Sequence, residues 1–159
     1  MKKISYDKNG NICPYEIIQL SHDECVINFI EDFNNEPKRK ENWGNLIQYN
    51  KDLKQLINSI LIQWIDGSYT TKKQKPNDID VVSFIDSINF KEQLKAFDMN
   101  LSLGYPKFKY NIDGYIVIKF PKGTVYFDKI TLDRYNYWKK WFGTDREGNP
   151  KAIIEIKND

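Results

Sequence analysis

Two acidic residues separated by one residue, Asp78 and Asp80, open an apolar stretch that runs to Ile85. The β-branched residues of this stretch predict a β-strand. Side chains alternate between the two faces of a strand, so the two carboxylates share one face. Neighbouring carboxylates repel each other, and a bound divalent cation removes the repulsion. Mg²⁺ fits this role because it takes oxygen ligands from one or two carboxylates together with substrate phosphates. The pair therefore predicts a Mg²⁺ site, with Mn²⁺ as the alternative ion.

A glycine-serine pair, Gly67 and Ser68, precedes the acids, with nine residues between Ser68 and Asp78. It follows a second predicted strand, residues 62–66. If a turn or a short helix starts at this pair, its free backbone N–H groups and the Ser68 hydroxyl point toward an anion. The intervening loop contains three lysines, which could equally neutralise a triphosphate or be exposed to solvent: Lys72, Lys73 and Lys75.

The order Gly67-Ser68, nine residues, Asp78-Ile79-Asp80 resembles the signature of the nucleotidyltransferase superfamily, which has the polymerase-beta-like fold. Three longer stretches are similar to a bacterial family of small, uncharacterised nucleotidyltransferase-like proteins. They are residues 64–71 (WIDGSYTT), 76–80 (PNDID) and 137–151 (YWKKWFGTDREGNPK). The likeness extends over nearly the whole chain.

The resemblance implies a minimal nucleotidyltransferase that moves an NMP group from an NTP to an acceptor and releases pyrophosphate. An RNA end, a protein hydroxyl and a small molecule are all open as acceptors. Two-metal catalysis draws on a third acid from a neighbouring strand. Asp113 is our choice, as metal ligand and as acceptor of the hydroxyl proton, and Asp98 is the second choice. The alternative for Asp113 is a turn, because Asp-Gly is a strong hairpin signal.

For the nucleotide, we expect the glycine-serine turn, Thr70 and Lys72 at the phosphates, and the resemblance adds Arg146 or Lys151 from the C-terminal stretch. Small members of the superfamily often act in bacterial defence or in toxin-antitoxin systems. The chain is too short for a second, acceptor-binding domain, so we expect a macromolecular acceptor, a homodimer or a partner protein.

Two other functions compete with this one. The first is a catalytically inactive module of the same fold that binds a nucleotide or a partner. The second is a nucleic-acid-binding protein that stacks bases on aromatic residues and contacts phosphates with lysines: Trp138, Trp141, Lys139 and Lys140. The formal net charge of only +2 weighs against the second.

The composition is that of one ordinary globular domain covering residues 1–159, with 40% hydrophobic and 29% charged residues. One histidine and two cysteines nearly exclude a zinc site of the Cys/His type. No apolar run approaches the roughly 20 residues that span a bilayer. We therefore expect a cytoplasmic protein without membrane contact, whose cysteines are reduced.

The pattern predicts an α/β (α+β) fold in which a small mixed sheet of four or five strands carries the site at its edge. The resemblance implies that this fold is nucleotidyltransferase-like. A capping box, Ser21 with Glu24, starts a helix over 23–33. Apolar spacing predicts helices over 41–59 and 89–97, packed on one face of the sheet. Further elements are a hairpin or arm in residues 1–14, a strand within 108–120, a helix over 132–143 and a last strand over 152–157. The basic run 38–40 is expected to be solvated, with a phosphate contact, for which Arg39 is the candidate, as the alternative.

Overall fold

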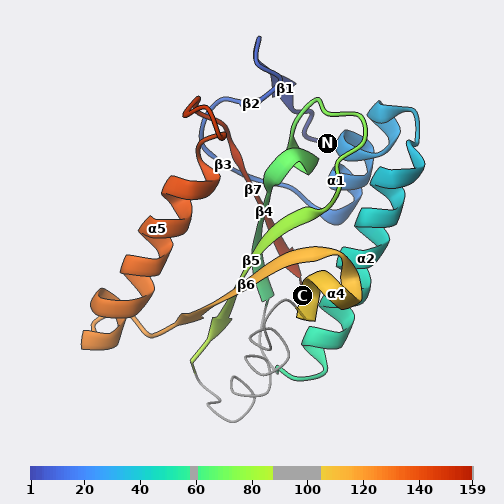
Figure 1. Cartoon of the computed structure of the whole chain (residues 1–159). Helices are drawn as coiled ribbons and strands as arrows, with labels where there is room; N and C mark the ends of the chain where they lie inside the picture. Colours follow the sequence, from blue (N-terminus) through green and yellow to red (C-terminus); the bar gives the residue numbers. More distant parts are fainter. Residues whose placement is uncertain (58–60, 88–104, 159) are drawn as a thin grey trace.

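The computed structural model describes residues 1–57, 61–87 and 105–158 (Figure 1). Its centre is a five-stranded mixed sheet, which confirms the expected fold class. The spatial order of the strands is β3 (Ile17–Gln19), β7 (Ile153–Asn158), β4 (Leu61–Asp66), β5 (Ile79–Asp86) and β6 (Ile112–Lys119). β4 is antiparallel to both of its neighbours, and β6 runs parallel to β5. The expected N-terminal hairpin is present as β1 (Ser5–Tyr6) and β2 (Ile12–Cys13).

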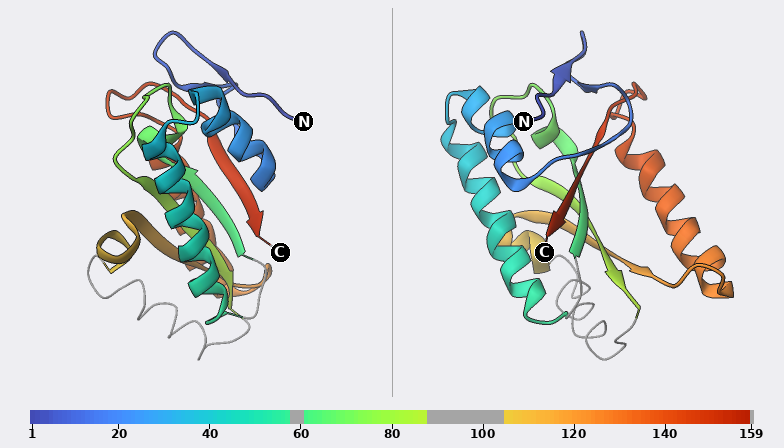
Figure 2. Two further views of the ribbon diagram at one scale, coloured as in Figure 1. Left: turned by 90° about the vertical axis from the view of Figure 1, so that its right-hand side faces the viewer. Right: turned by 180° about the vertical axis from the view of Figure 1, so that it is seen from behind.

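Helices cover both faces of the sheet (Figures 1 and 2). On one face, the larger apolar core joins the sheet to α1 (His22–Phe29), α2 (Pro37–Lys54) and α4 (Tyr105–Tyr110). On the other face, α5 (Asp133–Phe142) packs through Phe142 and Trp138. Along β5, Val81 faces the larger core and Val82 faces α5, as strand alternation requires. None of the helices in the described ranges has the length and apolar character needed to cross a membrane.

The helix boundaries follow local capping. Ser21 and Glu24 form the predicted capping box at the start of α1, which is followed by a 3-10 turn over Glu31–Phe33. α2 begins four residues earlier than expected, because Pro37 occupies its first turn and the Glu36 side chain accepts a hydrogen bond from the Lys38 N–H. The predicted helix over 89–97 and the second-choice acid Asp98 lie outside the described residues.

The stretch before β6 differs from the prediction of one strand across 108–120. Residues 105–110 form α4, and Asn111 then takes a left-handed conformation with φ of 54°. β6 runs without a break through Asp113 and Gly114, so this pair is not a hairpin turn. α5 follows a π-helical segment, Phe127–Leu132, and ends at Gly143, whose N–H donates to the Lys139 carbonyl.

Beneath α2, a buried polar network joins three strands of the sheet. The Gln63 amide nitrogen donates to Asn50 Oδ1 at 2.8 Å and lies 2.9 Å from Ser83 Oγ. The Asn158 amide nitrogen donates to Gln63 Oε1 at 2.9 Å, and the Asn158 carbonyl oxygen lies 2.6 Å from His22 Nε2. Each buried amide thus has partners, as burial demands.

Arg39 is fully buried, which corrects the expectation that the whole basic run is solvated. The early start of α2 turns this residue inward, and its guanidinium carbon lies 3.5 Å from the centre of the Phe33 ring. Burial lowers the pKa of Arg39. The guanidinium donates hydrogen bonds to four backbone carbonyls, those of Phe29, Tyr69, Thr71 and Lys73. Three of them belong to the loop after the glycine-serine pair, so Arg39 holds that loop against the helix.

We expect Arg39→Lys to lower the free energy of unfolding by about 3 kcal/mol, because one ammonium cannot serve four carbonyls arranged for a planar fork. In thermal unfolding this corresponds to a drop in Tm of roughly 6 to 12 °C. Lys40→Ala is the matched control, because Lys40 is the exposed neighbour on the same helix. Equal Tm values for the two variants would contradict this role.

Candidate functional site

Three carboxylates lie in one row across neighbouring strands. Asp66 ends β4 and stands opposite Asp80 of β5, which stands opposite Asp113 of β6. Asp66 has the same parity along its strand as Trp64, and Asp80 the same as Val82, both of which face α5. The row therefore lies on the α5 face of the sheet and reaches β6 at its edge. Asp78 comes directly before the first residue of β5, at the end of this strand where Asp80 lies.

The glycine-serine turn packs against the central acid of this row. Gly67 starts a 3-10 helix, Gly67–Thr70, with φ of +76°. A Cβ at Gly67 would lie 1.8 Å from Asp80 Oδ2 and 2.9 Å from its Cγ. Only glycine leaves room for the carboxylate and accepts this φ. The structure thus brings together the two halves of the motif that the sequence separates by nine residues.

Lys107 of α4 joins the two remaining predicted acids. Its ammonium contacts Asp78 and lies 3.4 Å from Asp113 Oδ1. The Lys107 side chain is 41% exposed, at the end of the row that borders solvent. Within the described residues, no ion pair reaches the carboxylate of Asp80.

Lys151 reaches the other end of the row. Its ammonium lies 2.6 Å from Asp66 Oδ1 and 3.4 Å from the Gly67 carbonyl oxygen, and both side chains are buried. The resemblance placed Lys151 at the substrate phosphates, but it is a buried partner of an acid that sequence reasoning did not single out. Arg146 is exposed on the turn between α5 and β7 and is not brought to the acids by an ion pair in the described ranges.

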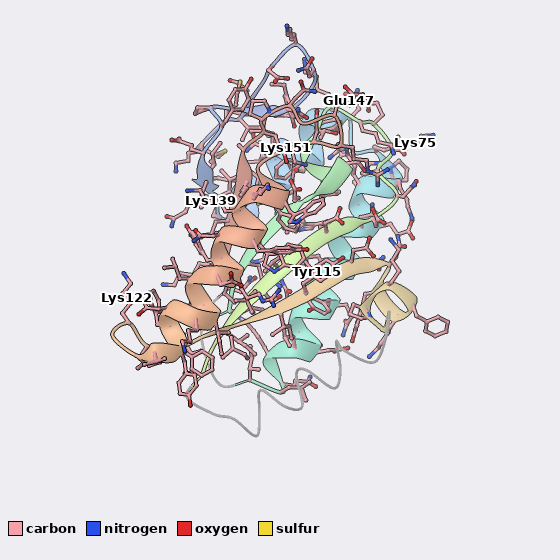
Figure 3. The ribbon with its side chains drawn as sticks, turned by 60° about the vertical axis from the view of Figure 1, so that its left-hand side comes forward. Lys75, Tyr115, Lys122, Lys139, Glu147 and Lys151 are labelled. Atoms are coloured by element: carbon pink, nitrogen blue, oxygen red, sulfur yellow. The ribbon has the colours of Figure 1, made fainter. Side chains whose placement is uncertain are left out.

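The other predicted nucleotide contacts are only partly in place. Ser68 is half-buried beside Gly67, so its hydroxyl is available at the turn. The Thr70 hydroxyl is buried, within 3.3 Å of Asp66 Oδ1 and of the Gly67 carbonyl, and it holds the turn instead of facing a ligand. Lys72 bonds through its backbone to Gly10 and lies over the Tyr6 ring, so it belongs to the N-terminal arm. Lys75 is exposed on the same loop (Figure 3).

Burial and mutual repulsion set the electrostatics of the row. Burial, with repulsion from Asp78 and Asp113, raises the pKa of Asp80 to about 6. Burial raises the pKa of Asp66 to about 7 even though Lys151 favours its charged form. Both shifts show carboxylates held where the charged form is disfavoured, which is frequent at functional sites.

The donor set suits a hard cation, since it consists of carboxylate oxygens around an acid without an ion-pair partner in the described ranges. Among the described residues, no three acidic, histidine or cysteine side chains are gathered as metal ligands. The Lys107 ammonium contacts both Asp78 and Asp113, so a cation that binds these two acids would have to displace it.

Sequence reasoning missed Asp66, Lys107 and the loop-holding role of Arg39. A signal for Asp66 was present, because an acid that ends a strand directly before a glycine-serine turn lies next to that turn. Lys107 had no such signal, because its position depends on how α4 packs against β6.

We expect Asp80→Asn to stabilise the metal-free protein at pH 7.5. The folded pKa of Asp80 is about 6, above the ordinary value of 3.8, so stability is lost as pH rises through this interval. The uncharged amide of asparagine removes the free-energy cost of holding a charged carboxylate there. Because the position is partly exposed, we expect the free energy of unfolding to rise by only about 1 to 2 kcal/mol. Thermal unfolding in EDTA at pH 7.5 and pH 4.5 should show the larger gain at pH 7.5.

Asp145→Asn is the control, because this substitution should lower the stability at neutral pH instead of raising it. Hydrogen bonds from Asn11 and Asn149 lower the pKa of Asp145 to about 2, so its charged form stabilises the fold at neutral pH. A lower Tm for Asp80→Asn than for the wild type at pH 7.5 would contradict the assigned electrostatics.

Comparison with known proteins adds one assignment. No curated protein and no solved structure matches the chain. One family of unknown function, DUF6932, matches residues 4–157. Because this match spans nearly the whole chain, the protein belongs to the DUF6932 family.

Proposed function

We propose that the protein is a Mg²⁺-dependent nucleotidyltransferase that transfers an NMP group from an NTP to an acceptor hydroxyl. One observation carries the proposal. The Asp80 carboxylate packs against Gly67 of the glycine-serine turn, where a Cβ would lie 1.8 Å from Oδ2, and Asp113 stands in register on the next strand. A phosphate-binding turn and a row of acids in contact are the two parts that such a transfer needs.

The turn and the acids divide the work. The triphosphate lies over the turn, where the half-buried Ser68 hydroxyl donates to a phosphate oxygen. Asp78, Asp80 and Asp113 would hold Mg²⁺, which neutralises their charge and that of the triphosphate when bound. The bound Mg²⁺ would displace the Lys107 ammonium from Asp78 and Asp113. The ammonium could then pair with the pyrophosphate that leaves.

The transfer itself is a substitution at the α-phosphorus. The acceptor oxygen forms a bond to phosphorus, the bond to the β-phosphate oxygen breaks, and pyrophosphate leaves with the electron pair. Asp113, at the exposed edge strand, accepts the proton of the acceptor hydroxyl. Lys151 and Asp66 act as positioning residues, because they hold the Gly67 carbonyl and the start of the turn from beneath.

A second candidate is an inactive module of the same fold. The ammonium of Lys107 already neutralises Asp78 and Asp113, an arrangement that needs no metal. In that case Lys107 is a permanent structural partner, and a nucleotide binds without turnover or not at all.

Calorimetric titration with each NTP should detect Mg²⁺-dependent binding to the wild type, and the double variant Asp78→Ala/Asp80→Ala should lose it. Transfer is then followed with an NTP labelled at the α-phosphate. Absence of NTP binding by folded wild type would overturn the proposal. Binding with the same affinity in the double variant, or binding without release of pyrophosphate over a range of acceptors, would favour the inactive module.

Gly67→Ala should abolish this NTP binding, because the new methyl displaces the Asp80 carboxylate. Gly123→Ala is the matched control, since Gly123 also has a positive φ, +85°, but has nothing within 4 Å of the added Cβ. In both variants the alanine must adopt a left-handed backbone conformation, which lowers the free energy of unfolding by about 1 to 2 kcal/mol. Unfolding curves measure this loss. Retention of Mg²⁺-dependent binding by Gly67→Ala would show that the turn and the acid are not one site.

A further inference from the structure

A series of aromatic rings runs from the acids to the end of α5. Tyr115 lies on β6 two residues after Asp113, on the same face, and its ring centre is 4.4 Å from that of Trp138. The Tyr137 ring follows at 5.2 Å from Trp138, and the Trp141 ring at 6.1 Å from Tyr137. We call these four residues the aromatic ladder. Figure 3 shows Tyr115 on the sheet beside α5.

Three rings of the ladder are open to solvent. Tyr115 and Tyr137 are each 44% exposed and Trp141 is 61% exposed, whereas Trp138 is half-buried against Phe142 and supports them. Large rings that are exposed next to one another mark an interaction surface more often than single exposed residues do. Their position, continuous with the row of acids, indicates that whatever lies on them also reaches Asp113.

The charge around the ladder is positive. Residues 122–142 contain five basic and two acidic side chains, an excess larger than the net charge of +2 for the whole chain. The Arg134 guanidinium lies 5.9 Å from the Tyr137 ring centre, and Lys139 and Lys140 are exposed on the same helix. Lys122 and Lys139 border the helix in Figure 3. A ligand that combines flat rings with negative charge fits this surface.

We propose that the aromatic ladder binds single-stranded RNA and leads its 3′ end to Asp113. Bases stack on exposed aromatic rings while basic side chains contact the phosphates. Two of the three exposed rings are tyrosines, whose hydroxyl groups both donate and accept hydrogen bonds and so suit the ribose 2′-hydroxyl. The role of this RNA as acceptor rests on the proposed function, but its binding does not.

The test measures fluorescence anisotropy of a 5′-labelled 12-nucleotide RNA with the full chain in EDTA and without NTP. The double variant Tyr137→Ala/Trp141→Ala should bind at least about tenfold more weakly, since stacking contributes substantially for each base. Phe108→Ala is the matched control, because Phe108 is 93% exposed on α4 and is not part of the aromatic ladder. Arg134→Ala/Lys140→Ala should make the binding less sensitive to salt.

Each outcome decides the inference. No RNA binding by folded wild type, or equal affinity of the ladder variant and the control, overturns it even if NTP binding is intact. DNA of the same sequence binding as tightly as the RNA overturns the assignment to RNA. Ladder-dependent RNA binding by a protein that binds no NTP would retain the surface while the proposed transferase fails. Ladder-dependent labelling of the RNA 3′ end supports both.

Discussion

Repulsion among carboxylates is the constraint around which this structure is built. Asp66, Asp80 and Asp113 stand at one level on three neighbouring strands, and Asp78 comes one step before. Such a row lowers the stability of the sheet, because like charges opposite each other on adjacent strands are destabilising. Ion pairs compensate for this at the two ends of the row: Lys151 pairs with Asp66, and Lys107 pairs with Asp78 and Asp113. Asp80 and Asp66 nevertheless keep raised pKa values, first because both are buried and, for Asp80, also because Asp78 and Asp113 repel it. Shifts of this kind are frequent at functional sites.

The compensating groups come from distant parts of the chain. Lys151 is brought in by the turn between α5 and β7, so the C-terminal stretch acts from beneath the glycine-serine turn and not above it. Arg39 anchors the loop after that turn from a helix nearly thirty residues upstream. A buried guanidinium tolerates this position because its two terminal nitrogens donate hydrogen bonds to four carbonyls, and removing it would leave those carbonyls without this donor. The glycine-serine half of the motif thus depends on residues outside it.

Periodicity and local signals predicted the mixed sheet, the capping box of α1 and a strand around Asp113. These features depend on residues close in sequence. The choice of Asp113 as the acid on a strand next to Asp80 came from the family resemblance, because the local Asp-Gly signal also allowed a turn. Other features depend on tertiary packing, which short-range patterns do not record. The buried state of Arg39 follows from an earlier helix start at Pro37, and the pairing of Lys151 with Asp66 joins residues 85 positions apart in the chain. Residues 108–110 were part of the predicted strand for their strand-forming aromatic content, yet they belong to α4, in which Tyr110 packs on Tyr49 of α2.

The polar network beneath α2 has a consequence for how the acids become aligned. Gln63 stands opposite Ser83 in the same β4–β5 ladder that sets Asp66 opposite Asp80. A slip of one residue would turn Gln63 to the other face and leave Asn50 and Asn158 buried without it. Each unpaired amide would cost about 1 to 3 kcal/mol. The network therefore favours one register of the sheet: side chains on the face opposite α5 select the strand pairing in which the acids coincide.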